Sequence, residues 1–270
     1  MIGGISSSGG VRTPKKRSKP RGSNCVRLTE SLSVETRVEI ADADIIGTND
    51  FSFCFWYKRP SSLGAFKTSG QSPRMFCQAA NKSNVATLAV GEVSGVTGSC
   101  LDFNVVISNA TIISLESNTH GMSLDTWHHI AVVCDRSSAS NSKIYVDGVA
   151  LTMETQTMDS STDIDIGGIF TLGGNAATSG GYGGFYKDLM FYSRALGVKD
   201  ISKIYNHKGR KRLLSISQLK TNLEFYLPLG DAPGDHATNS DGLLDISGNN
   251  RHGTGVENSG TLTIHSDSPS

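Results

Sequence analysis

The sequence predicts an all-β protein, and three observations lead to that prediction. Glycine is abundant, with 30 of 270 residues, and serine is abundant as well. Charged residues make up only 19% of the chain and hydrophobic residues 37%, which is unlike the Ala-, Leu-, Glu- and Lys-rich composition of a helical bundle. Short apolar runs with alternating positions recur between polar turns. The length allows one large β-sandwich or two small domains.

The run FSFCFWYK (51–58) is the clearest strand. Phe51, Phe53, Phe55 and Tyr57 fall on one face, and Cys54 and Trp56 fall on the other. Because both faces are apolar, we expect this strand to be central and covered on both sides. Further strands are expected at 75–80, 86–91, 101–107, 127–135, 143–151, 170–174, 184–192 and 222–231.

One hairpin and one helix are marked by local signals. Asp147-Gly148 sits within KIYVDGVAL, and both residues tolerate the positive φ that a two-residue hairpin turn requires. The segment 193–208 places Leu196, Ile201, Ile204 and Tyr205 on one stripe, which predicts a helix ended by Gly209.

The formal net charge of zero hides a basic N-terminal arm, residues 1–23. Its six basic residues have no acid before Glu30, and the remaining 19 basic residues face 25 acidic ones, leaving the body at about −6. The six basic residues of the arm are Arg12, Lys15, Lys16, Arg17, Lys19 and Arg21. The arm could contact nucleic acid or dock on an acidic protein surface; it has no aromatic residue to stack on bases, so we favour docking.

The sequence has no apolar run long enough to cross a bilayer and no apolar segment typical of a secretion signal. Its five cysteines are odd in number and lack metal-ligand spacing. We expect them to be buried, reduced thiols.

Five segments in order resemble the laminin-G-like, or concanavalin-A-like, jelly roll. They are FSFCFWYK (51–58), WHHIAVVCD (127–135), KIYVDG (143–148), GFYKDLMFYSRAL (184–196) and DISKIYN (200–206). The resemblance covers about 24–208 and implies an antiparallel two-sheet jelly-roll sandwich with one short helix. Its signature residues here are Trp56, Trp127, His129, Tyr145, Asp147 and Gly148. Lys187-Asp188 and Gly197 depart from the family pattern.

The C-terminal segment resembles the opening of such a domain, in NLEFYLPLGD and LLDISGNNRHGTGV. It could pack on its own domain, pair with a neighbouring subunit or be the remnant of a second domain; we favour one of the first two. The expected organisation is therefore an arm (1–23), a jelly roll (24–210) and a C-terminal extension with one strand and a Gly/Asn/Asp-rich tail (211–270).

No catalytic motif stands out, and we expect a protein that is not an enzyme. The glucanase pattern E-x-D-x-x-E is absent, and strand alternation points His128 and His129 to opposite faces. No cofactor is expected, with calcium the one candidate ligand. Its ligands would be Asp231, Asp241, Asp245 and Asn249, which are equally ordinary turn residues.

The combination of a family that usually works outside cells with no secretion signal leads to a functional hypothesis. We expect a virion structural protein, such as a decoration, neck or tail component of a bacteriophage, docked through its arm and made in the host cytoplasm. Its partners would be other virion proteins, its own copies and host surface glycans; membrane and nucleic acid are not expected partners. The alternative is a carbohydrate-binding, lectin-like protein outside any particle.

Overall fold

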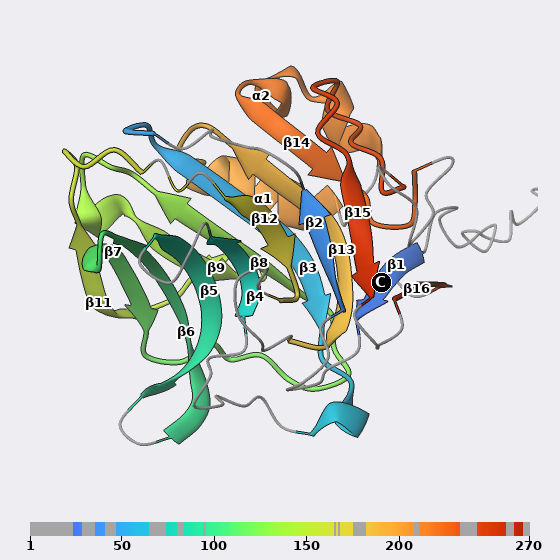
Figure 1. The fold of residues 1–270 in the computed structure, drawn as a ribbon, viewed down its shortest axis with the longest axis horizontal. Coiled ribbons are helices and arrows are strands. Elements are labelled where there is room, and N and C mark those ends of the chain that lie inside the picture. Colours follow the sequence, from blue (N-terminus) through green and yellow to red (C-terminus); the bar gives the residue numbers. More distant parts are fainter. Residues whose placement is uncertain are drawn as a thin grey trace, which may run out of the picture.

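The protein is a sandwich of two antiparallel sheets, seen in a computed structural model (Figure 1). The structure describes residues 24–28, 36–40, 47–64, 74–79, 84–93, 96–164, 166, 168–174, 182–207, 211–232, 242–257 and 262–266, with the backbone alone at 90–93, 96–98 and 211–212. Within these residues every strand pair is antiparallel. The all-β, two-sheet jelly-roll prediction is confirmed.

Sheet A runs from β10 at one edge to β16 at the other, and β14 pairs with β13 beside this path. In spatial order its strands are β10 (Val149–Ala150), β9 (Lys143–Val146), β8 (His128–Cys134), β3 (Phe51–Lys58), β13 (Gly184–Tyr192), β1 (Asn24–Leu28) and β16 (Thr263–Ser266), with β14 at Leu223–Leu227.

Sheet B lies over sheet A and contains the other strands. In spatial order they are β11 (Met153–Met158), β7 (Ala110–Ser117), β6 (Val96–Ile107), β5 (Val85–Val93), β4 (Arg74–Ala79), β12 (Ile169–Leu172), β2 (Thr36–Ile40) and β15 (Gly253–Glu257). Short 3-10 turns occur at η1 (Ser61–Leu63) and η2 (Ala139–Asn141).

Aromatic rings fill the core between the two sheets. Phe53 of sheet A stacks on Phe76 of sheet B with ring centroids 4.1 Å apart, and it lies 5.4 Å from Phe103 and 6.4 Å from Phe191. Burial of such rings provides most of the driving force for closing the sandwich.

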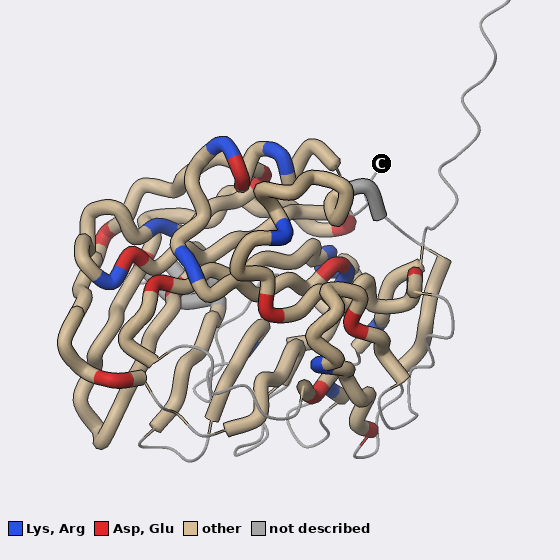
Figure 2. Tube along the Cα trace, turned by 90° about the horizontal axis from the view of Figure 1, so that it is seen from above, with Lys and Arg blue, Asp and Glu red and all other residues tan. Residues whose placement is uncertain are grey.

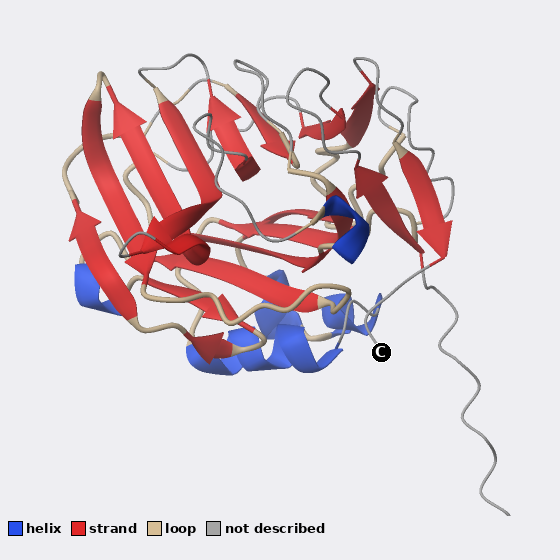
Figure 3. Cartoon of the chain, turned by 90° about the horizontal axis from the view of Figure 1, so that it is seen from below, coloured by secondary structure: helices blue, strands red, loops and turns tan. Residues whose placement is uncertain are grey.

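A second apolar layer covers the outer face of sheet A. The helices α1 (Val198–His207) and α2 (Ser217–Lys220), with η3 (Lys211–Ser215), lie along this face (Figure 3). Ile201 and Ile204 pack in one cluster with Cys54 and Met190 of the sheet. The prediction that strand 51–58 is covered on both faces is therefore confirmed: its residues are buried up to Lys58, which is half-buried.

The helix begins at Val198, within the predicted segment 193–208 and directly after Gly197, the residue that stands in the family's N-cap position. The carbonyl of Gly197 accepts hydrogen bonds from the backbone N–H groups of Asp200, at 2.8 Å, and Ile201, at 3.1 Å. Gly197 therefore acts as the N-terminal cap, and Arg194 before it forms an ion pair with Asp200 at 3.0 Å.

The 147–148 turn and the thiols follow the sequence prediction. Asp147 and Gly148 have φ values of 52° and 79°, as a primed hairpin turn requires. All five cysteines are buried and reduced. Burial also raises the pKa of Cys134 well above its ordinary value, so the thiol stays protonated.

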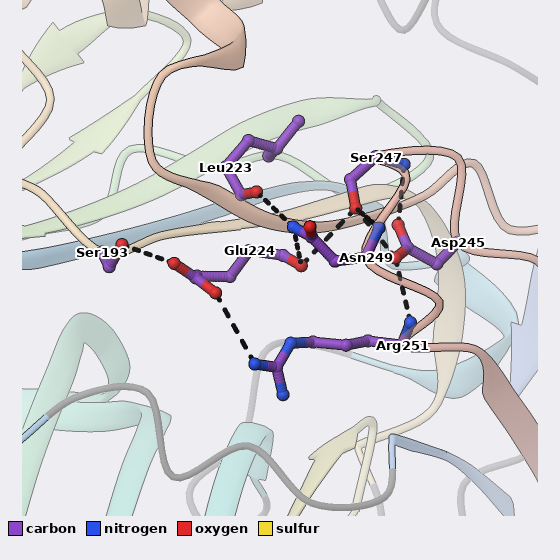
Figure 4. A network of polar contacts seen from close by, with 7 residues as sticks. All are labelled: Ser193, Leu223, Glu224, Asp245, Ser247, Asn249 and Arg251. Atoms are coloured by element: carbon purple, nitrogen blue, oxygen red, sulfur yellow. Dashed lines mark hydrogen bonds and ion pairs between the residues drawn. The ribbon is translucent and has the colours of Figure 1, made fainter.

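The C-terminal segment belongs to the same sandwich. Its strands β14, β15 and β16 pair with β13, β2 and β1, so 211–270 contributes three strands rather than the one expected. A polar network fixes residues 245–251 against β14 (Figure 4). Asp245 accepts hydrogen bonds from Tyr226 N, Ser247 N, Ser247 Oγ and Arg251 N at 2.8–3.0 Å. Asn249 Nδ2 donates to the carbonyls of Leu223 and Glu224.

Candidate functional site

Four of the signature residues, Trp56, His129, Asp147 and Gly148, form a structural unit on sheet A. Trp56 packs against His129, with ring centroids 5.2 Å apart, and against Tyr205 of α1 at 5.6 Å. Asp147 accepts a hydrogen bond from the backbone N–H of His129 at 2.8 Å, while Gly148 approaches the Tyr205 ring so closely that a Cβ there would lie 3.2 Å from it. These residues join the hairpin to the helix.

His128 takes part in a Ser–His–Asp arrangement that the sequence did not indicate. Its Nδ1 lies 2.8 Å from Asp147 Oδ2, and its Nε2 lies 3.3 Å from Ser123 Oγ. The backbone N–H of Ser123 also donates to Nε2, at 2.9 Å. Because that donation occupies the lone pair a general base needs, the arrangement ties the loop at 123 to the sheet and is not suited to nucleophilic catalysis.

Lys187 and Asp231 form a buried ion pair at the start of β1. The Lys187 ammonium is 1% exposed and donates both to Asp231 and, at 2.6 Å, to the carbonyl of Asn24. Asp231 Oδ1 accepts the backbone N–H of Asn24 at 2.8 Å. The pair therefore fixes the first residue of β1 to β13 and to the loop after β14.

Asp188 occupies a bulge between β13 and β3 with a φ of 53°. Its Oδ1 accepts the Tyr226 hydroxyl at 2.7 Å, and its Oδ2 has no hydrogen-bond partner among the described residues. Burial raises the pKa of Asp188 to about 7, although Lys187 and Tyr226 act in the opposite direction. His129 shows the reverse effect, since burial lowers its pKa to about 4.

These two groups should give opposite pH dependences of stability. Asp188 has a folded-state pKa of about 7 against 3.8 when unshifted, so its stabilising contribution is present below pH 3.8 and is lost as the pH rises through 7. His129 changes from 6.5 to about 4, so its contribution is present above pH 6.5 and is lost as the pH falls through 4. The free energy of unfolding of Asp188→Asn should therefore increase relative to that of wild type as the pH rises. That of His129→Phe should increase relative to wild type as the pH falls.

Denaturant unfolding at intervals from pH 4 to pH 7.5 measures both differences. The pKa of Asp102 is also raised, to about 6, but that carboxyl is present in all three proteins and cancels in the comparison. Stability curves that stay parallel to the wild-type curve for both variants would contradict the prediction.

The candidate calcium ligands are engaged by donors of the protein. Asp231 is paired with Lys187, the Asp245 carboxylate accepts four hydrogen bonds, and Asn249 uses its amide nitrogen as a donor. Asp241 lies outside the described residues, as do Arg12, Lys15, Lys16, Arg17, Lys19 and Arg21 of the arm. In the part of the chain that the structure describes, no three His, Cys, Asp or Glu side chains are grouped so that they could hold a metal ion.

A carboxylate pair lies on the outer face of sheet B. Asp102 and Glu116 are direct partners in the β6–β7 ladder, and both side chains are half-buried. Burial, followed by the charge of Glu116, raises the pKa of Asp102 to about 6, and Asn104 Nδ2 donates to it at 2.6 Å. The two acids come from different strands, so no motif within one strand could have indicated them.

A row of alternating cations and rings lies on the outer face of sheet A, beyond the helices. We call Arg27, Phe185, Lys58 and Trp127 the cation–aromatic row. Arg27 pairs with Phe185 across β1 and β13, and Phe185 pairs with Lys58 across β13 and β3. Trp127 precedes β8, next to the Tyr57–His128 pair.

The cations of the row lie against its rings. Lys58 Nζ is 4.7 Å from the Phe185 centroid and 5.6 Å from that of Trp127, while Arg27 Cζ is 5.7 Å from Phe185. His265 of β16 meets the Phe185 ring edge-on at 5.6 Å. Arg27 is exposed and the other three row residues are half-buried. Such contacts hold long cationic side chains in position, which lowers the entropic cost of a later contact with a ligand.

Charge elsewhere on the described surface is mixed. Basic and acidic positions are interspersed in Figure 2, without a block of one sign. None of the described helices is long and apolar enough to span a membrane. Among the described residues, the cation–aromatic row brings rings and cations together on one face of the sheet.

Fold, register and the helix-covered face together define a lectin-type jelly roll. The chain belongs to the laminin-G-like family of the concanavalin A-like lectin/glucanases superfamily, whose model matches residues 32–202. The family resemblance found in the sequence motifs is therefore confirmed. No curated protein matches the sequence.

Solved structures that share the fold include two proteins from different organisms. One is a protein of Bacteroides ovatus ATCC 8483 to which carbohydrate binding is provisionally ascribed; it aligns with a TM-score of 0.59 at 14% identity over 92% of this chain. This chain spans 61% of that protein's length. The other is the heptameric SAP-like pentraxin of Limulus polyphemus, with a TM-score of 0.50 at 12% identity over 70% of this chain and 84% of that one.

Proposed function

We propose that this protein is a non-enzymatic carbohydrate-binding module that uses the cation–aromatic row. The observation that carries the proposal is the row itself: two rings and two cations on the same sheet face against which α1 and α2 pack. Sugars present apolar C–H groups and hydroxyl groups together, and rings beside charged donors match both. The superfamily and the Bacteroides ovatus protein of similar fold support this choice.

Phe185→Ala should weaken binding to the best ligand of a glycan array by about tenfold, since a central aromatic contact is commonly worth more than 1 kcal/mol. Val149→Ala is the matched control. Val149 is 68% exposed and lies on β10, at the opposite edge of sheet A, so its truncation should leave binding unchanged. Equal affinities of wild type and Phe185→Ala, with both proteins folded, would mean that the row is not the site.

Hydrolysis is the outcome that would overturn the non-enzymatic part of the proposal. The Asp102–Glu116 pair has the residue types that glycoside hydrolases use, with one pKa raised. Release of reducing ends from a polysaccharide panel by wild type, abolished in Asp102→Asn, would identify a hydrolase.

A second candidate function is a structural role in a virus particle. The feature that favours it is the concentration of six basic residues between Arg12 and Arg21, ahead of a body with about −6 charge. Such an arm suits docking onto an acidic protein surface. Mass spectrometry of particles purified from cells that produce the protein tests this role, and absence of the chain from the particles would exclude it.

A further inference from the structure

A buried lysine and a buried aspartate meet next to a third buried carboxyl group. Lys187 Nζ contacts Asp231 Oδ2, and the two side chains are 1% and 9% exposed. Asp188, the next residue on β13, is also 1% exposed. Burial raises the pKa of Asp188 to about 7, Lys187 and Tyr226 lower it, and the charge of Asp231 raises it. The amine and the carboxylate of the ion pair therefore both lie within electrostatic reach of Asp188.

The backbone of Asn24 holds the lysine and the aspartate in a fixed orientation. Its N–H donates to Asp231 Oδ1 at 2.8 Å, and its carbonyl accepts from Lys187 Nζ at 2.6 Å. The other carboxylate oxygen, Oδ2, faces the lysine. An amide made from these two groups would keep Oδ1 as its carbonyl oxygen and one hydrogen on Nζ. Both hydrogen bonds to Asn24 would therefore remain after such a reaction.

Asp188 is placed to move protons. Tyr226 Oη donates to its Oδ1 at 2.7 Å, while its Oδ2 is buried without a hydrogen-bond partner among the described residues. Tyr226 belongs to an apolar cluster with Cys54 and Met190. A carboxyl group with a pKa near 7 gives up and takes back a proton readily at neutral pH. The apolar surroundings favour neutral forms over charged ones.

We propose that Lys187 and Asp231 join in an intramolecular amide bond, with Asp188 carrying the protons. A proton passes from the Nζ ammonium to the Asp231 carboxylate, which gives an uncharged amine and an uncharged carboxylic acid. The amine lone pair forms a bond to Cγ, and the Cγ–Oδ2 bond breaks. Asp188, in its acid form, gives a proton to the departing hydroxyl and takes one back from the nitrogen. One water leaves, and Asp188 ends in the form in which it began.

The fold supplies the proximity that this condensation needs. The pairing of β13 with β14 brings residue 187 next to the loop that carries residue 231. Well-oriented groups within one molecule react as if at an effective concentration of about 10⁵ M or more. The product ties β13 to the loop after β14. Because the five cysteines are reduced, this cross-link would give the sandwich a covalent tie that needs no oxidising compartment.

Mass spectrometry of the purified full-length chain tests the bond. After incubation of the folded protein near neutral pH, its intact mass should be lower than the mass of its sequence by one water molecule. Trypsin cleaves after lysine and arginine, so the digest should contain one branched peptide in which 144–194 is joined to 221–251. Asp188→Asn should keep the mass of its sequence, because an amide at 188 cannot carry the protons.

Two further variants are controls for charge and for handling. Lys187→Arg keeps a positive charge beside Asp231 but does not give up its proton, so it should keep the mass of its sequence. Lys199→Arg, on the exposed face of α1, should lose one water as wild type does. Circular dichroism shows which variants are folded, and the two variants at 187 and 188 are independent of each other.

Three results would overturn the proposal or a part of it. A wild-type mass equal to that of the sequence after prolonged incubation would overturn the bond. A loss of water found only in unbranched peptides would also do so, because an aspartate before glycine, as at Asp147-Gly148, can lose water by closing a ring on its own backbone. A branched peptide in Asp188→Asn would overturn the role of Asp188 and keep the bond.

Discussion

Lys187→Met is expected to lower the free energy of unfolding by about 3–5 kcal/mol, because it leaves a buried charge without its partner. The Asp231 side chain is 9% exposed and depends on the Lys187 ammonium for neutralisation. Asn24 would also lose the hydrogen bond that its carbonyl accepts. Denaturant unfolding measures the loss directly.

A double-mutant cycle separates the ion pair from packing. The double variant Lys187→Met/Asp231→Asn should lose less free energy of unfolding than the two single variants together, because no unpaired charge remains. In addition, the asparagine side-chain oxygen at 231 can still accept the backbone N–H of Asn24. Lys199→Met on the exposed face of α1 is the matched control and should cost about 0.5 kcal/mol or less. A Lys187→Met variant no less stable than that control would contradict the expectation.

Phe53→Ala should lower the free energy of unfolding by a similar amount, about 3–5 kcal/mol, because it leaves a cavity between the two sheets. The ring is fully buried and contacts Phe76, Phe103 and Phe191, so both sheets lose contacts at once. Thermal or denaturant unfolding provides the measurement.

The same substitution at Phe185 supplies the comparison. Phe185 is half-buried on the outer face, so its truncation should cost about 1 kcal/mol or less. If the two alanine variants lost equal stability, the assignment of Phe53 to the central core and of Phe185 to an accessible surface would be wrong. The comparison also shows that Phe185→Ala is folded well enough for binding measurements.

Local patterns were sufficient for much of the fold. The alternation in 51–58 indicated a strand apolar on both faces, and β3 is covered by the core on one side and by α1 on the other. Asp147-Gly148 predicted its turn from backbone preferences that need no distant partner. The strands β15 and β16 were not predicted because they lie at sheet edges, where few apolar residues are required, and their sequences are rich in Gly, Thr and Ser.

The candidate site could not be predicted in the same way, because it depends on register between distant segments. Arg27, Lys58 and Phe185 are far apart in the sequence and meet only through the pairing of β1, β13 and β3. A weaker signal was present elsewhere: Lys187-Asp188 departs from the family pattern, and this is where the structure has a buried ion pair and a bulge. The departure from the family pattern marked positions 187 and 188 as unusual in the sequence. Only the structure shows that these two side chains are buried and which groups they contact.

The placement of β1 between β13 and β16 has a consequence for synthesis on the ribosome. Residues 24–28 are translated well before their partners, which are residues 184–186 and 263–266. During that interval Val26 and Leu28, apolar residues of the core, have no sheet to join. Long-range pairing of this kind slows folding and exposes apolar strands to aggregation. The apolar side chains of β1 therefore find their first strand partner only when β13 has been made.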